Sequence, residues 1–174
     1  VRSGLIPSLH SGFMASACSS WRIGILRPGE DPIGNMAASL ADPRVLGGPD
    51  DDAATNRMLL EVTLRRSTRG LIDAVRHARL PSGDNVLVIV DQFEELFRFR
   101  AARHSENRDE AISFVRLLLE AAAQREHPIF IVLTMRSDFI GDCMNFPGLP
   151  EAVNAGLYLV GRMSREGLRA AITG

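Results

Sequence analysis

The feature that most constrains the fold is an unbroken apolar run at residues 86–90, which the acid Asp91 follows directly. A strand without polar alternation is typical of a position covered on both faces of a parallel sheet. Two further strand candidates, residues 21–26 and 129–134, lie on either side of it in the sequence, and stretches with helical character separate the three. Strands that alternate with helices predict an α/β fold with a parallel sheet and flanking helices.

The intervening segments predict several helices and one further strand. Asp31 suits the N-cap of a helix and Pro32 its first position, so we expect a helix from there to about residue 41. Further helices are predicted over 55–78, with a break near 67–70, and over 108–125. Residues 42–54 are predicted to form a flexible connection. Residues 1–9 are interpreted as the remainder of a helix, residues 157–160 as a short last strand, and Ser164 as the cap of a closing helix.

Composition limits the classes of protein and of partner. A length of 174 residues favours one domain, and a net charge of −1 gives no basic footprint for nucleic acid. The apolar runs are far shorter than the roughly 20 residues that a membrane helix needs. We therefore expect neither nucleic-acid nor membrane binding. All 20 basic residues are arginine, and the chain contains no lysine.

The carboxyl ends of the predicted strands are where chemistry is expected, because ligands of parallel α/β sheets bind there. Asp91 stands at the end of the central strand, and Glu94 and Glu95 follow it. Carboxylate oxygens are ligands that Mg²⁺ prefers, and a further acid can orient or deprotonate water. The Asp91–Glu94 spacing is equally typical of a helix cap, so both interpretations stay open.

Arg136 follows the third predicted strand. A guanidinium in this position can contact a terminal phosphate and stabilise its charge. The alternative is a solvated arginine beside Ser137, with the serine acting as the N-cap of a helix.

The combination of five stretches carries a family resemblance. VRSGLIPSL, WRIGILRPGEDP, VLVIVDQFEELF, IFIVLTMRSDF and YLVGRMSREGLRAAI together resemble the STAND class of P-loop NTPases. Within that class the chain is similar to the bacterial novel STAND group, which is often fused to WD-repeat propellers. The resemblance covers residues 1–174 as one partial NTPase domain. DQFEELF and TMRSDF are its most specific parts.

The resemblance implies a role for each candidate residue. Asp91 matches the metal-binding acid of the Walker B motif. Glu94 and Glu95 match its downstream acids, one of which polarises the attacking water. Arg136 matches the sensor position, where it contacts nucleotide, and residues 1–9 match the helix that follows the phosphate loop. ATP and Mg²⁺ are the implied cofactors of the parent domain.

The chain departs from the family pattern at the phosphate loop. That loop needs a lysine within G-x-x-x-x-G-K-[ST], and no such stretch is present. The family's sheet order, 5-1-4-3-2, places the strand before that loop near the middle of the sheet. We therefore expect a P-loop NTPase-like sheet that lacks its first, central strand and its phosphate loop. We interpret the chain as a truncated piece of an ATPase domain, with weak or absent ATP binding of its own.

The implied function is a nucleotide-dependent switch or scaffold in signal transduction, in the bacterial cytoplasm. Its implied partners are nucleotide, other copies through the NTPase domain, and other domains of the same polypeptide. A non-catalytic interaction module that has lost its phosphate loop is the main alternative. A metal-dependent hydrolase that uses Asp91, Glu94 and Glu95 without a phosphate loop is a third hypothesis.

Overall fold

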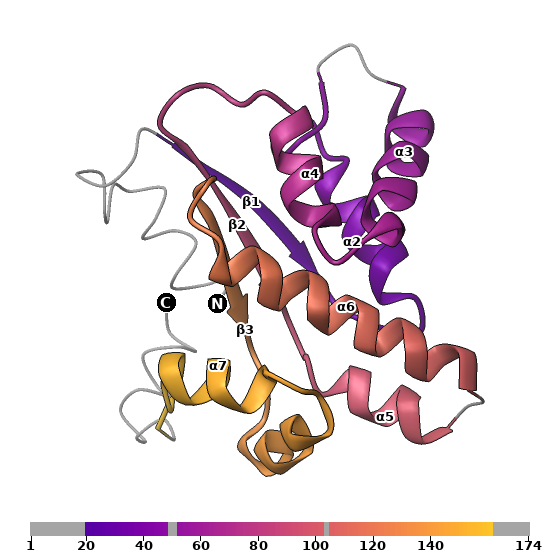
Figure 1. Cartoon of the computed structure of the whole chain (residues 1–174), viewed down its shortest axis with the longest axis vertical. Coiled ribbons are helices and arrows are strands. Elements are labelled where there is room, and N and C mark those ends of the chain that lie inside the picture. The colour runs from indigo at the N-terminus through magenta and orange to yellow at the C-terminus, as the bar shows by residue number, and fades with distance from the viewer. Residues whose placement is uncertain (1–19, 49–51, 103–104, 162–174) are drawn as a thin grey trace, which may run out of the picture.

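Three parallel strands form the centre of the protein (Figure 1). The computed structural model describes residues 20–48, 52–102 and 105–161. Its strands are β1 (Ser20–Leu26), β2 (Asp84–Val90) and β3 (Ile129–Leu133), in the order β1-β2-β3. Leu26 is aligned with Val90, and Val90 with Leu133, so the three carboxyl ends lie at one edge. The predicted α/β fold with a parallel sheet is confirmed.

The larger helices cover one face of this sheet (Figure 1). Helix α2 packs on β1 and α6 packs on β3, while α3 and α4 pack beside them. The 3₁₀ helix η1 and helix α7 follow β3 and contact each other. The helices are α2 (Pro32–Leu40), α3 (Ala53–Arg66), α4 (Gly70–His77), α5 (Glu95–Ala102), α6 (Ser105–Ala123), η1 (Ser137–Asn145) and α7 (Leu149–Gly156).

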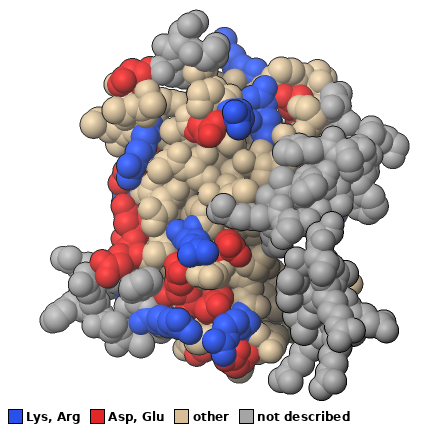
Figure 2. All heavy atoms as spheres, turned by 180° about the vertical axis from the view of Figure 1, so that it is seen from behind, with Lys and Arg blue, Asp and Glu red and all other residues tan. Residues whose placement is uncertain are grey.

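Strand alternation divides the apolar side chains between the two faces of the sheet. Val86, Val88 and Val90 belong to the large core on the helix side, and Leu87 and Ile89 form a smaller cluster on the other side. Figure 2 views the molecule from behind, where charged side chains lie above, to the left of and below a central area of uncharged residues. All seven residues of β2 are buried, as the continuous apolar run predicts for a central strand.

Local signals account for the helix boundaries. Asp31 caps α2 by accepting a hydrogen bond from Gly34 N at 2.8 Å, and Pro32 begins the helix, as predicted. The predicted break near 67–70 is also confirmed, because α3 ends at Arg66 and α4 begins at Gly70. A Cβ on Gly70 would lie 2.5 Å from the carbonyl oxygen of Thr63, so a glycine permits this close approach of the two helices.

Four predictions differ from the structure or lie outside it. Residues 157–160 were predicted as a strand, but they form no strand and their four apolar side chains are exposed. The segment 42–54 was predicted to be a flexible connection, but in its part 42–48 Val45 and Leu46 are buried in the core. The predicted helices at 1–9 and after Ser164 lie outside the described residues. Within the described part of the chain, no helix has the length and apolar character needed to cross a membrane.

Candidate functional site

The candidate site lies where β2 and β3 end side by side. Asp91 N donates to Leu26 O at 2.8 Å, and Thr134 N donates to Val90 O at 2.9 Å. These bonds continue the sheet for one residue beyond its strands. They bring Asp91 and Thr134 together, although 43 positions separate them in the sequence.

The Thr134 hydroxyl connects the two strand ends. Its Oγ1 donates to Asp91 Oδ1 at 2.6 Å and accepts from Gln92 N at 3.1 Å. Gln92 has a φ of 56°, a left-handed conformation that is unfavourable for a residue with a Cβ. The turn therefore directs the chain away from β2 with Asp91 held at the sheet edge.

The structure does not support Asp91 as a helix cap. Helix α5 begins at Glu95, four residues after Asp91, and the Asp91 carboxylate accepts its hydrogen bond from Thr134. No role for Thr134 was predicted from the sequence. A usable signal is that Thr134 directly follows the apolar strand β3, just as Asp91 directly follows the apolar strand β2.

Glu94 and Glu95 have different environments. The Glu95 carboxylate accepts a hydrogen bond from Gly29 N at 3.2 Å, which joins α5 to the loop after β1. Glu94 is 6% exposed, and its Oε2 is buried without a hydrogen-bond partner in the described structure. A buried, unpartnered carboxylate oxygen is costly, so it points to a partner such as water or a cation that belongs there.

Arg136 lies on the same edge, two residues after Thr134. Its guanidinium forms an ion pair with Asp138, with Nη2–Oδ2 at 2.6 Å, and lies 5.9 Å from the ring centre of Phe139. The Asp138 carboxylate raises the pKa of Arg136, and the charge of Glu94 acts in the same direction. Ser137 begins η1, which makes Arg136 and not Ser137 the N-cap residue.

The carboxylates of Asp91 and Glu94 are suited to bind a magnesium ion whose other ligands would be waters and phosphate oxygens. In the part of the chain that the structure describes, no group of three or more histidine, cysteine, aspartate or glutamate residues is arranged to hold a metal. Mg²⁺ commonly takes one or two carboxylates together with waters and substrate phosphates. Asp91 and Glu94 supply oxygens of that type.

The arrangement of the strands and helices identifies the fold class of the protein. They form the α/β architecture of a P-loop NTPase-like domain, with its acids and its arginine after neighbouring parallel strands. The chain belongs to the novel STAND NTPase 1 family, whose model matches residues 1–174. No curated protein and no solved structure gave a match.

Proposed function

We propose that this chain is part of an ATP-binding signal-transduction ATPase and supplies the metal, water and sensor side chains of its nucleotide site. One observation carries the proposal. Asp91, the buried Glu94 and Arg136 follow two neighbouring parallel strands at a single edge. Membership of the STAND family gives that edge its expected ligand, ATP with Mg²⁺.

Each side chain has a role that its environment supports. Asp91, positioned by Thr134, would hold Mg²⁺, which neutralises phosphate charge when it is bound. Glu94 would orient and polarise the attacking water, because its buried Oε2 has no other partner in the described structure. Glu95 is better suited to hold the loop after β1, through Gly29.

Arg136 would contact the terminal phosphate. Its present partner, Asp138, forms an ion pair with it in which both side chains are more than half exposed. Ion pairs between exposed side chains contribute little to stability, so a phosphate group can compete for the arginine. The exchange of Asp138 for phosphate would make the position of Arg136 depend on the nucleotide.

The phosphate-binding loop would come from a segment outside residues 1–174. The chain contains no lysine, and in the described structure the outer edge of β3 pairs with no strand. Leu157, Tyr158, Leu159 and Val160 are exposed, which suits a segment that pairs with a further strand. We therefore propose little or no ATP binding by this chain alone.

In the parent protein, nucleotide state would control association with other copies and with further domains of the same polypeptide, WD repeats among them. We place this switch in the bacterial cytoplasm. Membership of the STAND family supports the proposed association and the proposed location.

The test of the site is ATP turnover by the longest open reading frame that contains these residues. Glu94→Gln should lower turnover by about 100-fold or more while ATP binding persists, which is the usual effect of losing a general base. Glu95→Gln, the matched control, should retain most of the activity. Wild-type turnover by the Glu94→Gln variant would exclude the proposed role.

A non-catalytic interaction module is the second candidate. The absence of lysine favours it, as do three exposed apolar side chains on α3: Met58, Leu59 and Val62. The DNA upstream of Val1 separates the two candidates. An in-frame glycine-rich stretch with Gly-Lys-Ser or Gly-Lys-Thr supports the ATPase, whereas a start codon directly before Val1 supports the module.

A further inference from the structure

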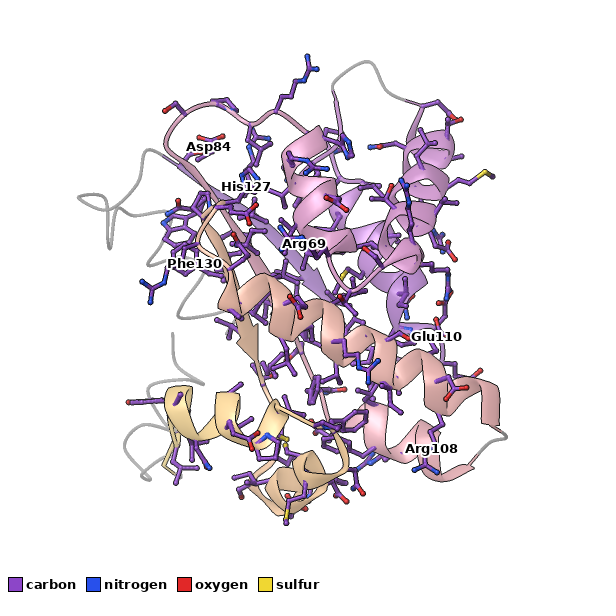
Figure 3. All side chains as sticks on the ribbon, in the orientation of Figure 1. Arg69, Asp84, Arg108, Glu110, His127 and Phe130 are labelled. Atoms are coloured by element: carbon purple, nitrogen blue, oxygen red, sulfur yellow. The ribbon has the colours of Figure 1, made fainter. Side chains whose placement is uncertain are left out.

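Helix α3 carries apolar side chains on two opposite sides. Its inner side packs on α2 and α4, and Leu60 and Leu64 on that side are its buried residues. Met58, Leu59 and Val62 are 68%, 61% and 62% exposed. With 3.6 residues per turn, these three lie on the side of the helix that faces away from Leu60 and Leu64. Figure 3 shows α3 at the margin of the helical layer, with side chains that project away from the neighbouring helices.

The three exposed side chains form one continuous group, which we call the outer stripe of α3. Residues three or four positions apart are neighbours on the surface of a helix, so Val62 adjoins both Met58 and Leu59. Single exposed apolar residues are common on soluble proteins, whereas a contiguous apolar group with charged residues at its rim is typical of a surface that binds another protein. The outer stripe therefore has the character of a contact surface.

The charges at the two ends of the outer stripe are of opposite sign. Asp52 is the N-cap residue of α3, and Arg66 is its last residue, one turn after Val62. Both are exposed, and within the described residues neither side chain has an ion-pair partner. Arg65, by contrast, is already paired with Glu110 and other acids. An acid at one end and an arginine at the other are thus available to a partner.

This arrangement of charge makes the outer stripe complementary to a second copy of itself. Two copies of α3 that pack antiparallel about a two-fold axis beside residue 60 place Met58 of one copy opposite Val62 of the other. At 1.5 Å per residue, Asp52 of one copy and Arg66 of the other then lie within about 3 Å of each other along the helix direction. A parallel pair would instead place equal charges side by side.

We propose that the outer stripe of α3 is a contact surface between two copies of this chain, which pack through it as antiparallel helices. The contact is weak, because α3 has 14 residues and one helix pair of this length buries less than the roughly 1,200 Å² of a stable complex. The proposal does not depend on ATP binding, since Asp91, Glu94 and Arg136 take no part in it.

Sedimentation equilibrium of the 174-residue chain, at concentrations up to about 1 mM, tests the association. We expect the average mass to rise from 19.0 kDa towards twice that value as the concentration increases. Val62→Glu places a charge in the centre of the outer stripe and should keep the chain monomeric throughout. Because Val62 is exposed, this variant should fold, which circular dichroism checks. Arg57→Glu, the matched control, changes an exposed residue on the other side of α3 and should associate as the wild type does.

A charge exchange tests the antiparallel arrangement. Asp52→Arg and Arg66→Glu each bring like charges together at both ends of the pair, so each variant alone should associate about fivefold more weakly, or less still. An equimolar mixture of the two should recover the wild-type association, because opposite charges then meet at both ends. If Asp52→Arg fails to fold, Asp52→Asn keeps a capping side chain, and its combination with Arg66→Glu should associate more strongly than Arg66→Glu alone.

Three results would overturn the proposal. The wild type could remain monomeric at about 1 mM, which would show that the outer stripe does not bind a second copy. Val62→Glu could associate as strongly as the wild type, which would place the contact elsewhere. The mixture of charge variants could associate as weakly as its components, and in the fallback pair Asp52→Asn could bring no recovery, which would exclude the antiparallel packing.

Discussion

Thr134 Oγ1 donates a hydrogen bond to Asp91 Oδ1 at 2.6 Å and thereby joins the carboxyl ends of β2 and β3. The same hydroxyl accepts from Gln92 N at 3.1 Å, so one atom satisfies a carboxylate and a turn amide. The acid proposed to hold Mg²⁺ is therefore positioned by the strand that leads to Arg136, the arginine proposed to contact phosphate. A substitution of Thr134 at the end of β3 therefore also alters the environment of Asp91 at the end of β2.

Thr134→Val should destabilise the fold. The substitution keeps the branched shape but leaves Asp91 Oδ1 and Gln92 N without this partner, so the free energy of unfolding should fall by about 1–2 kcal/mol. Urea denaturation measures the difference. Thr134→Ser, which keeps the hydroxyl, should lose much less, and equal losses in both variants would show that the hydroxyl does not matter.

Gln92→Gly should leave stability unchanged or raise it. Gln92 has φ 56°, where a side chain costs about 1 kcal/mol and glycine does not. Arg79, with φ 47° after α4, should respond to glycine in the same way. Arg76→Gly lies inside α4 and should instead lower stability by about 1 kcal/mol. Thermal unfolding of the three variants tests this contrast, which fails if Gln92→Gly behaves like Arg76→Gly.

Glu94→Gln should raise the free energy of unfolding, because it replaces a carboxylate by an uncharged amide of the same shape at a buried position. Functional sites often reduce stability in this way. Glu120→Gln, an exposed substitution of the same type on α6, should change stability by less than about 0.5 kcal/mol. A clear loss of stability in Glu94→Gln would show that the carboxylate has a structural partner.

Asp84 should make the stability of the protein depend on acid pH. Hydrogen bonds from Ser20 and Arg22 hold the pKa of Asp84 below its ordinary value. Ionised Asp84 therefore stabilises the fold at neutral pH, and this contribution declines as the pH falls through the folded-state pKa. Asp84→Asn should be less stable than wild type at pH 7, and the gap should narrow below about pH 4. Urea titrations at both pH values measure the gap, and a constant gap would contradict the mechanism.

Sequence patterns were sufficient to predict the three parallel strands of the sheet and the edge at which the residues after β2 and β3 meet. The apolar run of β2 indicated a central parallel strand, and parallel strands bring residues that follow them, such as Asp91 and Arg136, to one edge. The Asp31-Pro32 cap and the break before Gly70 could also be predicted from the sequence, because each depends on a few adjacent residues.

The remaining features depend on contacts between distant segments. The bond from Thr134 to Asp91 requires the register of two strands, and the difference between Glu94 and Glu95 arises because Glu95 meets Gly29. Residues 157–160 have the composition of a strand, but a strand also needs a hydrogen-bonded neighbour.

The most direct test of the nucleotide site is the affinity for Mg²⁺-ATP, measured by calorimetry on the 174-residue chain and on the longest reading frame that contains it. We predict no saturable micromolar binding to the chain and micromolar, Mg²⁺-dependent binding to the longer protein, weakened at least tenfold by Asp91→Asn and by Arg136→Ala. Micromolar Mg²⁺-dependent binding to the chain alone would contradict the account. Wild-type affinity in both variants of the longer protein would contradict it as well.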